Sequence, residues 1–203
     1  MNKCILIGAG EYNNEKITKD KGDLLIACDG GFDYLKKLDL DIDYLIGDFD
    51  SIKEIPNNIK ILKFPKQKDE TDIFLGLKLG IDKGYKKFYF YGCLGGRIEH
   101  SLANIQHLIY LKKRGLEGFL IQNNRALQVL SNEEIYLSSL CSDKLFSLFS
   151  ISENAIISIK NAKYELDNHL LTNSFPLGID NELLDKEVKI SVKEGMILLV
   201  RPF

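Results

Sequence analysis

Short apolar runs alternate with longer helix-like segments over about the first 122 residues, and this alternation limits the possible folds more than any other feature. The six apolar runs span residues 3–8, 23–29, 43–48, 59–65, 86–92 and 118–123. Because they are continuously hydrophobic, they are typical of parallel strands buried on both faces. The helix-like segments between them span residues 31–40, 71–84 and 99–115. Strand followed by helix, repeated, predicts an α/β domain with a mainly parallel sheet.

The pattern changes at about residue 123. Short runs separated by Asn, Asp, Ser and Gly span residues 125–131, 133–139, 144–151, 154–160, 163–168, 187–195 and 196–203. One of them, 187–193, alternates apolar and polar residues, and no long helical pattern follows. These features are typical of an antiparallel β-sandwich or a partial barrel. We therefore expect an α/β N-terminal domain, residues 1–122, with a mainly parallel sheet, followed by an all-β sandwich domain, residues 123–203.

Composition narrows the class of protein further. Of the 203 residues 45% are hydrophobic, which supports a substantial core, and the formal net charge of −2 gives no reason to expect a nucleic-acid partner. No stretch approaches the roughly 18 consecutive apolar residues of a membrane span. The cysteines are widely spaced and form no CxxC pair; they are Cys4, Cys28, Cys93 and Cys141. We interpret them as reduced core residues of a cytoplasmic protein that binds neither nucleic acid nor membrane.

Polar clusters follow four of the predicted strands. They are CDGG at 28–31, GDFDS at 47–51, KQKDETD at 66–72 and GCLGGRIEH at 92–100. Each cluster alone is weak, since Asp and Gly are common turn residues. Open α/β sheets, however, bind ligands beyond the carboxyl ends of their strands. Four clusters at that edge of one sheet therefore predict a binding site.

Asp48 and Asp50 stand one residue apart at the end of a strongly apolar run. If the chain stays extended there, both carboxylates point to the same side, as hard cations such as Mg²⁺ require. The alternative is a solvated acidic turn. Asp72 opens a predicted helix just after Thr71, so it is either a third metal ligand or a helix cap.

The GGR sequence at 95–97 predicts an anion site. Its glycines allow close backbone approach to a ligand, and Arg97 offers paired donors suited to phosphate at the start of a helix. The GK[ST] of a P-loop is missing, and the GAG at 8–10 is not a complete dinucleotide fingerprint because Asn13 replaces the third glycine. A carboxylate-held Mg²⁺ beside phosphate-binding loops is the equipment of phosphoryl transfer from a nucleotide.

The motifs ACDGG, IGDFDSI, KDETD and GGRIEHSLANI, in this order and spacing, resemble those of the thiamine pyrophosphokinase family, and the segment 176–200 is similar to the end of that family. The resemblance implies an α/β nucleotide domain, a β-sandwich thiamine-binding domain, and a homodimer with active sites at the subunit interface. It also implies transfer of diphosphate from ATP to the hydroxyl of thiamine, with release of AMP. Neither thiamine nor attack at the β-phosphorus follows from the residues themselves.

The resemblance also implies roles for individual residues. Asp48, Asp50 and Asp72 match the Mg²⁺ carboxylates and, with Arg97, the catalytic residues. The nucleotide-binding positions are Asp29, Gly30, Gly31, Ser51, Lys68, Asp69, Gly95, Gly96, Arg97, His100 and Asn104. The substrate-binding positions are Gln67, Glu99, Asp180, Asn181 and Glu182. Two of these depart from the family pattern, since Glu99 replaces an Asp and Asp180 replaces a Ser.

Two other functions fit parts of the sequence. An apolar strand ending in DxD also opens phosphatases that use a nucleophilic aspartate, where Asp48 would be phosphorylated and Asp50 would be the acid/base. Such an enzyme would not need the GGR loop. A non-catalytic nucleotide sensor of the same fold is the second alternative, and the intact aspartates argue against it.

Overall fold

The computed structural model describes residues 2–13, 15–38, 40–49, 59–65, 69–138, 143–184 and 187–203. The chain divides into two compact units, residues 1–123 and 124–203. The predicted positions Asp50, Ser51, Gln67 and Lys68 lie outside the described residues, as does Cys141.

Within its described residues the first unit holds a parallel sheet of six strands: β1 (Cys4–Ile7), β2 (Leu24–Cys28), β3 (Tyr44–Gly47), β4 (Lys60–Lys63), β5 (Lys87–Tyr91) and β6 (Glu117–Gln122). Their order across the sheet is β6-β5-β1-β2-β3-β4, and all neighbours pair in parallel. All six predicted apolar runs are strands. Strands β1 and β2 are completely buried because helices cover both faces of the sheet.

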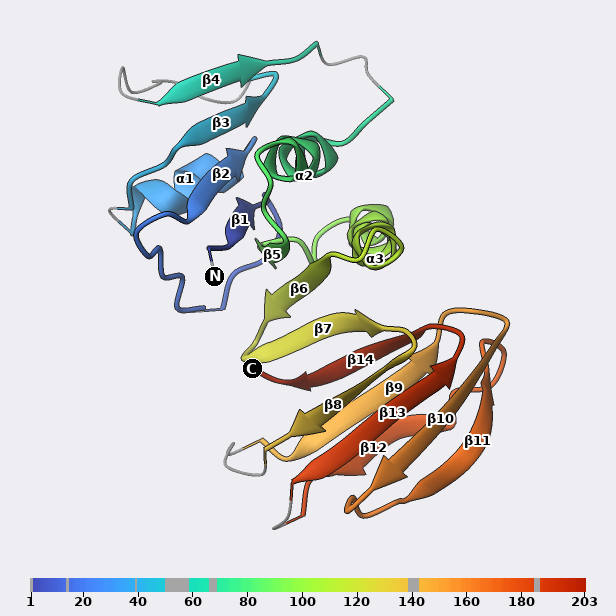
Figure 1. Cartoon of the computed structure of the whole chain (residues 1–203). Helices are drawn as coiled ribbons and strands as arrows, with labels where there is room; N and C mark the ends of the chain where they lie inside the picture. The colour runs from blue at the N-terminus through green and yellow to red at the C-terminus, as the bar shows by residue number, and fades with distance from the viewer. Residues whose placement is uncertain are drawn as a thin grey trace. The chain divides into compact units, whose positions relative to one another are not determined.

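Three helices in the described ranges cover this sheet: α1 (Gly31–Lys36), α2 (Asp72–Asp82) and α3 (Ile98–Lys112). The connection β2-α1-β3 runs along the sheet in one direction, whereas β4-α2-β5 and β5-α3-β6 run in the other. Because such crossovers are right-handed, α1 covers one face and α2 and α3 cover the opposite face (Figure 1). Helix α3 ends at Lys112, and Gly115 follows at φ 70°, a left-handed conformation that glycine adopts readily after a helix.

Strand β4 differs from the expectation of burial on both faces. Three of its four residues are exposed, including Ile61, whose exposed fraction is 44%. Strand β4 is the last strand in the sheet order, so only β3 pairs with it in the described part of the chain. Its flanking lysines, Lys60 and Lys63, are charges of the kind that protect edge strands from pairing with other chains.

The second unit contains two antiparallel sheets. One has the order β12-β9-β14-β7, made of β7 (Arg125–Leu130), β9 (Leu145–Ser150), β12 (Gly178–Glu182) and β14 (Ile197–Pro202). The other has the order β11-β10-β13-β8, made of β8 (Glu133–Leu137), β10 (Asn154–Lys160), β11 (Leu166–Thr172) and β13 (Val188–Glu194).

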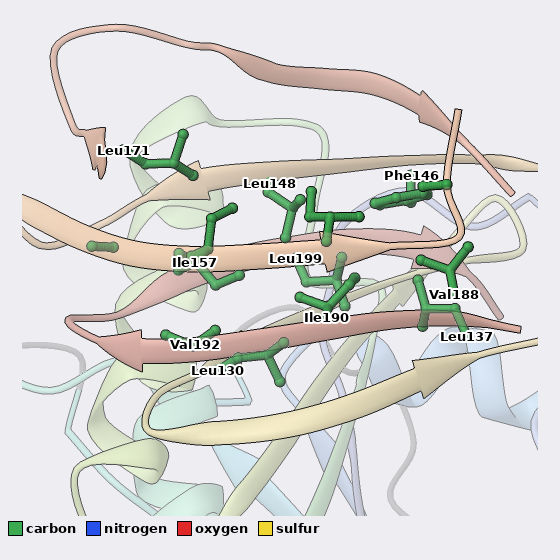
Figure 2. Close-up of a cluster of buried hydrophobic side chains, with 14 of the residues drawn as sticks. Leu130, Leu137, Phe146, Leu148, Ile157, Leu171, Val188, Ile190, Val192 and Leu199 are labelled. Atoms are coloured by element: carbon green, nitrogen blue, oxygen red, sulfur yellow. The ribbon is translucent and has the colours of Figure 1, made fainter. Parts of the chain in front are cut away.

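Figure 2 shows the core of this unit, in which apolar side chains from both sheets meet. Phe146 and Leu148 come from one sheet, Ile157 and Ile190 from the other, and all four are completely buried. In β13 the buried residues alternate with half-buried polar ones, which is the pattern of a sheet with one face on a core.

The predicted fold class, an α/β N-terminal domain followed by an all-β sandwich domain, is confirmed. The cysteines of the described residues, Cys4, Cys28 and Cys93, are buried and carry free thiols. Burial raises the pKa of the Cys93 thiol to about 12, which makes it unreactive at neutral pH. None of the helices in the described ranges is long and apolar enough to cross a membrane.

Candidate active site

The candidate site lies where the chain changes direction along the parallel sheet. The strands β1 and β5 are neighbours in the sheet. The chain continues from β1 to β2 and from β5 to β6, so the two connections lead in opposite directions across the sheet. Ligands of open α/β sheets bind at the carboxyl ends of such a strand pair. A cavity of about 290 Å³ lies there, lined by Gly8, Ala9, Gly10, Ile73, Gly92, Cys93, Gly95, Gly96, Arg97, His100 and Asn104.

Two loops that follow β1 and β5 form one wall of the cavity. Hydrogen bonds join them beyond the strand ends, from Gly8 N–H to Tyr91 O at 2.9 Å and from Gly10 N–H to Gly92 O at 2.7 Å. A Cβ atom on Gly10 would lie 2.5 Å from the carbonyl oxygen of Leu94, so only glycine permits this approach. The loops therefore need glycine for their own packing as well as for access to a ligand.

Asn104 on α3 holds the loop after β5 through a side-chain hydrogen bond. This side chain is buried on α3 and donates a hydrogen bond of 2.7 Å to Cys93 O. Gly95 and Gly96 follow at φ 75° and 61°, and α3 begins at Ile98. A glycine loop that leads into a helix N-terminus presents backbone N–H groups and a positive dipole end to an anion.

Arg97 and Glu99 form an ion pair beside this loop. Glu99 Oε1 accepts from Arg97 Nε at 2.6 Å and lies 2.5 Å from Arg97 Nη2. The pKa of the Glu99 carboxyl is lowered by the hydrogen bond from its own backbone N–H and by the Arg97 side chain. Both side chains are mostly exposed, so the pair contributes little to stability. The guanidinium stays available to a stronger anion.

A second cavity, of about 270 Å³, continues along the same edge. It shares Gly8, Ala9, Ile73, His100 and Asn104 with the first cavity and adds Cys28, Asp29, Glu70, Thr71, Asp72 and Ala103. The structure thus brings Asp29, Asp72, Gly95, Gly96, Arg97, His100 and Asn104 together along one edge of the sheet, as predicted from the sequence.

Asp72 was expected to be either a metal ligand or a helix cap, and the contacts of Thr71 exclude the second role. The Thr71 side chain accepts the Phe74 N–H at 3.2 Å and is the N-cap of α2, so Asp72 is not that cap. Asp69 lies two residues before Thr71 and is exposed.

The backbone around Asp48 is not extended, contrary to the premise of the sequence argument. Phe49 has φ 62°, a left-handed conformation that is unusual for a bulky residue, and its side chain is 9% exposed. Asp48 is half-buried beside Gly47, and a Cβ atom on Gly47 would lie 3.4 Å from the Asp29 Cα atom. Asp48 and Asp29 therefore end neighbouring strands.

The donor set suits Mg²⁺ in kind, because the candidate ligands are carboxylates and Mg²⁺ takes one or two of these together with substrate phosphates. Among the described residues no group of three His, Cys, Asp or Glu side chains is close enough to hold an ion. Asp48 and Asp72 belong to this part of the chain and Asp50 does not.

Gly30 and Gly31 have a structural reason that the sequence alone does not show. A Cβ atom on Gly31 would lie 2.2 Å from the carbonyl oxygen of Ile7, because α1 starts directly against β1. On Gly30 it would lie 3.0 Å from Ala9 Cβ. The close approach of α1 to β1 explains these glycines without a ligand.

The predicted substrate residues of the second unit lie on β12, at a bulge. The pairing with β9 shifts between Gly178 and Asn181, and Asp180 has φ 54° with its N–H bonded to Ser147 Oγ at 3.1 Å. Asn181 is 4% exposed; its Oδ1 accepts the N–H groups of Tyr164 and Glu182, and its Nδ2 donates to Tyr164 O. This amide stabilises the strand.

Asp180 and Glu182 differ from Asn181 in exposure. Asp180 is exposed, and Glu182 forms an ion pair of 2.8 Å with Lys163. Bulges of this kind often redirect side chains at binding sites.

The sequence interpretation missed the loop after β1. Gly8, Ala9 and Gly10 line the site, although GAG was considered only as a dinucleotide fingerprint and rejected. The rule that selected the other clusters also selects this one, because GAG directly follows a buried strand at its carboxyl end.

The fold and this site define a class of protein: one that joins an α/β domain, with a glycine-lined cavity at the carboxyl edge of its parallel sheet, to a β-sandwich. The family model described as "Thiamin pyrophosphokinase, catalytic domain" matches residues 16–120, and "Thiamin pyrophosphokinase, vitamin B1 binding domain" matches residues 132–197. The chain belongs to the thiamin pyrophosphokinase family, which confirms the family predicted from the sequence.

Known proteins of similar sequence and structure agree with this assignment. The chain is 29% identical to thiamine pyrophosphokinase of Bacillus subtilis (strain 168) over 163 residues, which covers 76% of each protein. The crystal structure of thiamine pyrophosphokinase from Bacillus subtilis matches with a TM-score of 0.90 and 25% identity, covering 100% of this chain and 99% of that chain. Thiamin pyrophosphokinase from Candida albicans shares the fold, with a TM-score of 0.75 and 17% identity, covering 100% and 89%.

Proposed function

We propose that this protein transfers diphosphate from ATP to the hydroxyl of thiamine, giving thiamine diphosphate and AMP. The observation that carries the proposal is the glycine loop with Arg97 at the switch point of the sheet, in a chain of the thiamin pyrophosphokinase family. The family matches bear out the transferase predicted from the sequence. They give no support to the phosphatase or to the sensor.

The reaction forms one P–O bond and breaks another. The thiamine hydroxyl oxygen attacks the β-phosphorus of ATP, and the bond between that phosphorus and the oxygen bridging to the α-phosphorus breaks. Its electron pair leaves with AMP, and the hydroxyl proton is released. Because the chemistry is mainly positioning and charge neutralisation, the glycine loop and Arg97 hold the phosphates while charge moves onto the leaving AMP.

Asp48, Asp50 and Asp72 are the proposed ligands of Mg²⁺. Mg²⁺ held by these carboxylates would neutralise phosphate charge and help to orient the phosphates. Asp72 lines the second cavity at the start of α2, and Asp48 follows the neighbouring strand β3, which supports their assignment. Asp29, Asp69, His100, Asn104 and the glycines Gly30, Gly31, Gly95 and Gly96 form the proposed nucleotide site, together with Ser51 and Lys68.

The second unit is the proposed thiamine-binding domain, in agreement with the family model that matches it. Exposed Asp180 and half-buried Glu182 are candidates for contact with the cationic thiazolium. Gln67 and Glu99 are the proposed substrate-binding residues of the first unit. Asn181 acts by shaping the bulge that presents Asp180. We further propose a cytoplasmic homodimer with active sites at the subunit interface. Apolar side chains that are exposed next to the predicted site residues support a contact between subunits. They are Ile98 and Leu102 on α3 and Ile179 on β12.

The direct test is incubation with ATP, Mg²⁺ and thiamine, with separation of the nucleotides and thiamine esters. AMP and thiamine diphosphate in equal amounts are expected. ADP with thiamine monophosphate would contradict diphosphate transfer, and phosphate released from a simple phosphoester would favour the phosphatase.

A further inference from the structure

Carboxylates of the chain itself occupy two anion-binding groups of the glycine loop. Glu99 accepts hydrogen bonds from the Arg97 guanidinium, as described above. Glu11, from the loop after β1, accepts the backbone N–H of Gly96 through its Oε1 at 3.3 Å. Both carboxylates lie where the proposed function requires phosphate oxygens to bind.

The contact of Glu11 with the loop is close on a second side. A Cβ atom on Gly95 would lie 2.5 Å from Glu11 Cδ and 2.8 Å from Oε2, so the carboxylate fills the space next to the Gly95 Cα atom. Gly95 and Gly96 both line the cavity. The carboxylate therefore packs against two of the residues that would hold a ligand.

The backbone of Glu11 is fixed, whereas its side chain is exposed. The Glu11 N–H donates to Leu94 O at 3.0 Å, next to the bond from Gly10 to Gly92. Tyr12 then folds back, stacks on Tyr34 and donates from its hydroxyl to Gly8 O. The charge of Glu11 is thus anchored beside the loop, while the carboxylate itself is free to rotate away from Gly96.

We propose that Glu11 is an intramolecular competitor for the phosphate-binding loop, displaced from the Gly96 N–H when a nucleotide binds. The inference rests on the proposed function, because that function makes the loop a phosphate site. A carboxylate oxygen on a backbone N–H is a weaker version of a phosphate oxygen in the same place. The displaced carboxylate stays near the bound phosphates, and its repulsion lowers their affinity. Glu11 thereby sets the affinity of the enzyme for polyphosphate.

Removal of this charge should strengthen nucleotide binding. For unit charges separated by a few ångströms near a protein surface, the expected change is roughly fivefold in the dissociation constant, which is about 1 kcal/mol. The change should shrink at high salt, because exposed charges are screened. Removal of the Arg97 charge should instead weaken nucleotide binding.

The experiment measures binding of the Mg²⁺ complex of α,β-methylene ATP, which cannot release AMP, by calorimetry on the full-length protein. Glu11→Gln and Glu11→Ala should both bind it roughly fivefold more tightly than the wild type at low ionic strength. Glu117→Gln is the matched control, since Glu117 pairs with Lys87 at the first residues of β6 and β5, at the edge of the sheet opposite the site, and its loss changes the net charge equally. Its affinity should equal that of the wild type.

Two results would overturn the inference. If Glu11→Ala binds more weakly and Glu11→Gln restores the wild-type value, the carboxylate supports the loop instead of competing for it. If both variants bind as the wild type does, Glu11 is irrelevant to the phosphates. Arg97→Ala, measured in parallel, separates these results from failure of the proposed function. Weaker binding by Arg97→Ala would support the glycine loop as a phosphate site. Unchanged binding by Arg97→Ala, or no binding by the wild type, would contradict both the proposed function and the role of Glu11.

Discussion

Glu99 Oε1 lies 2.6 Å from Nε and 2.5 Å from Nη2 of Arg97, so one carboxylate oxygen takes two of the donors that the guanidinium would offer to a phosphate. The pair is exposed, with 71% and 62% of the two side chains accessible to solvent. A triphosphate with Mg²⁺ carries more charge than one carboxylate and can replace it. The pair orients Arg97 at the mouth of the cavity before the nucleotide arrives.

The first prediction concerns Arg97. Replacement by Lys keeps the charge and loses the planar, paired grip, so Arg97→Lys should lose roughly 1.5–3 kcal/mol of transition-state stabilisation, about 10- to 100-fold in rate. Steady-state kinetics with ATP varied at fixed thiamine measure the effect. Glu99→Gln should reduce activity less than Arg97→Ala does. Unchanged kcat and ATP KM in Arg97→Ala would show that Arg97 has only a structural role.

The second prediction concerns the metal ligands. Asp48→Asn and Asp72→Asn each remove a proposed ligand charge, so activity should fall by orders of magnitude at saturating Mg²⁺. The fold should survive, because relief of repulsion between neighbouring carboxylates offsets any lost contacts. Thermal unfolding checks the fold, and titration of activity with Mg²⁺ checks the site. Near-normal turnover in either variant would remove that residue from the metal site.

The strands of the first unit other than β4 were predictable because burial on both faces leaves a continuous apolar run, whereas β4 has an apolar centre but three exposed residues. Strand β12 was not predictable, since it carries Asp180, Asn181 and Glu182 in a five-residue edge strand with a bulge. Strand β11 was predicted only in part, because four consecutive residues are exposed and its sequence therefore shows no alternation of buried and exposed positions. Sequence periodicity reports burial, and edge strands bury little.

The candidate site followed the same logic. The position of the motifs at strand ends predicted which residues gather, because a parallel sheet brings its carboxyl ends to one edge. Side-chain contacts were not predictable. Asn181 forms hydrogen bonds with the backbone of Tyr164, which is 17 positions away in the sequence, so no local pattern predicts them. The left-handed conformation of Phe49 was not predictable either, because bulky residues seldom adopt it.

The third prediction follows from that buried amide. Asn181→Ala leaves the N–H groups of Tyr164 and Glu182 and the carbonyl of Tyr164 without this partner, so the free energy of unfolding should fall by about 2–4 kcal/mol. Asn173→Ala, at an exposed turn, is the control and should change it by less than about 0.5 kcal/mol. Chemical denaturation measures both. If Asn181→Ala keeps wild-type stability while its thiamine KM rises, the residue contacts thiamine directly.

The last prediction concerns His107, which is buried on α3 and stacks on Phe74 of α2 with ring centroids 5.2 Å apart. Its Nδ1 atom is buried and has no hydrogen-bond partner in the described structure. Burial lowers the pKa of this imidazole from 6.5 to about 4, because no charged partner compensates for the lost hydration of the protonated ring.

This lowered pKa makes stability depend on pH in a defined direction. Between pH 6.5 and about 4 the unfolded chain binds a proton at His107 that the folded protein does not, so stability falls as the pH falls through this window. The contribution is complete above pH 6.5, is lost progressively on acidification, and amounts to roughly 3 kcal/mol. His107→Phe keeps an aromatic ring against Phe74 and removes the titration. Denaturation at several pH values from 7 to 4.5 should therefore show a shallower loss of stability in His107→Phe than in the wild type. His169→Gln, an exposed histidine on β11, controls for the loss of one imidazole. Any packing cost of the larger ring is independent of pH, so the slope decides: equal slopes in the wild type and His107→Phe would show that His107 titrates alike in the folded and unfolded chain.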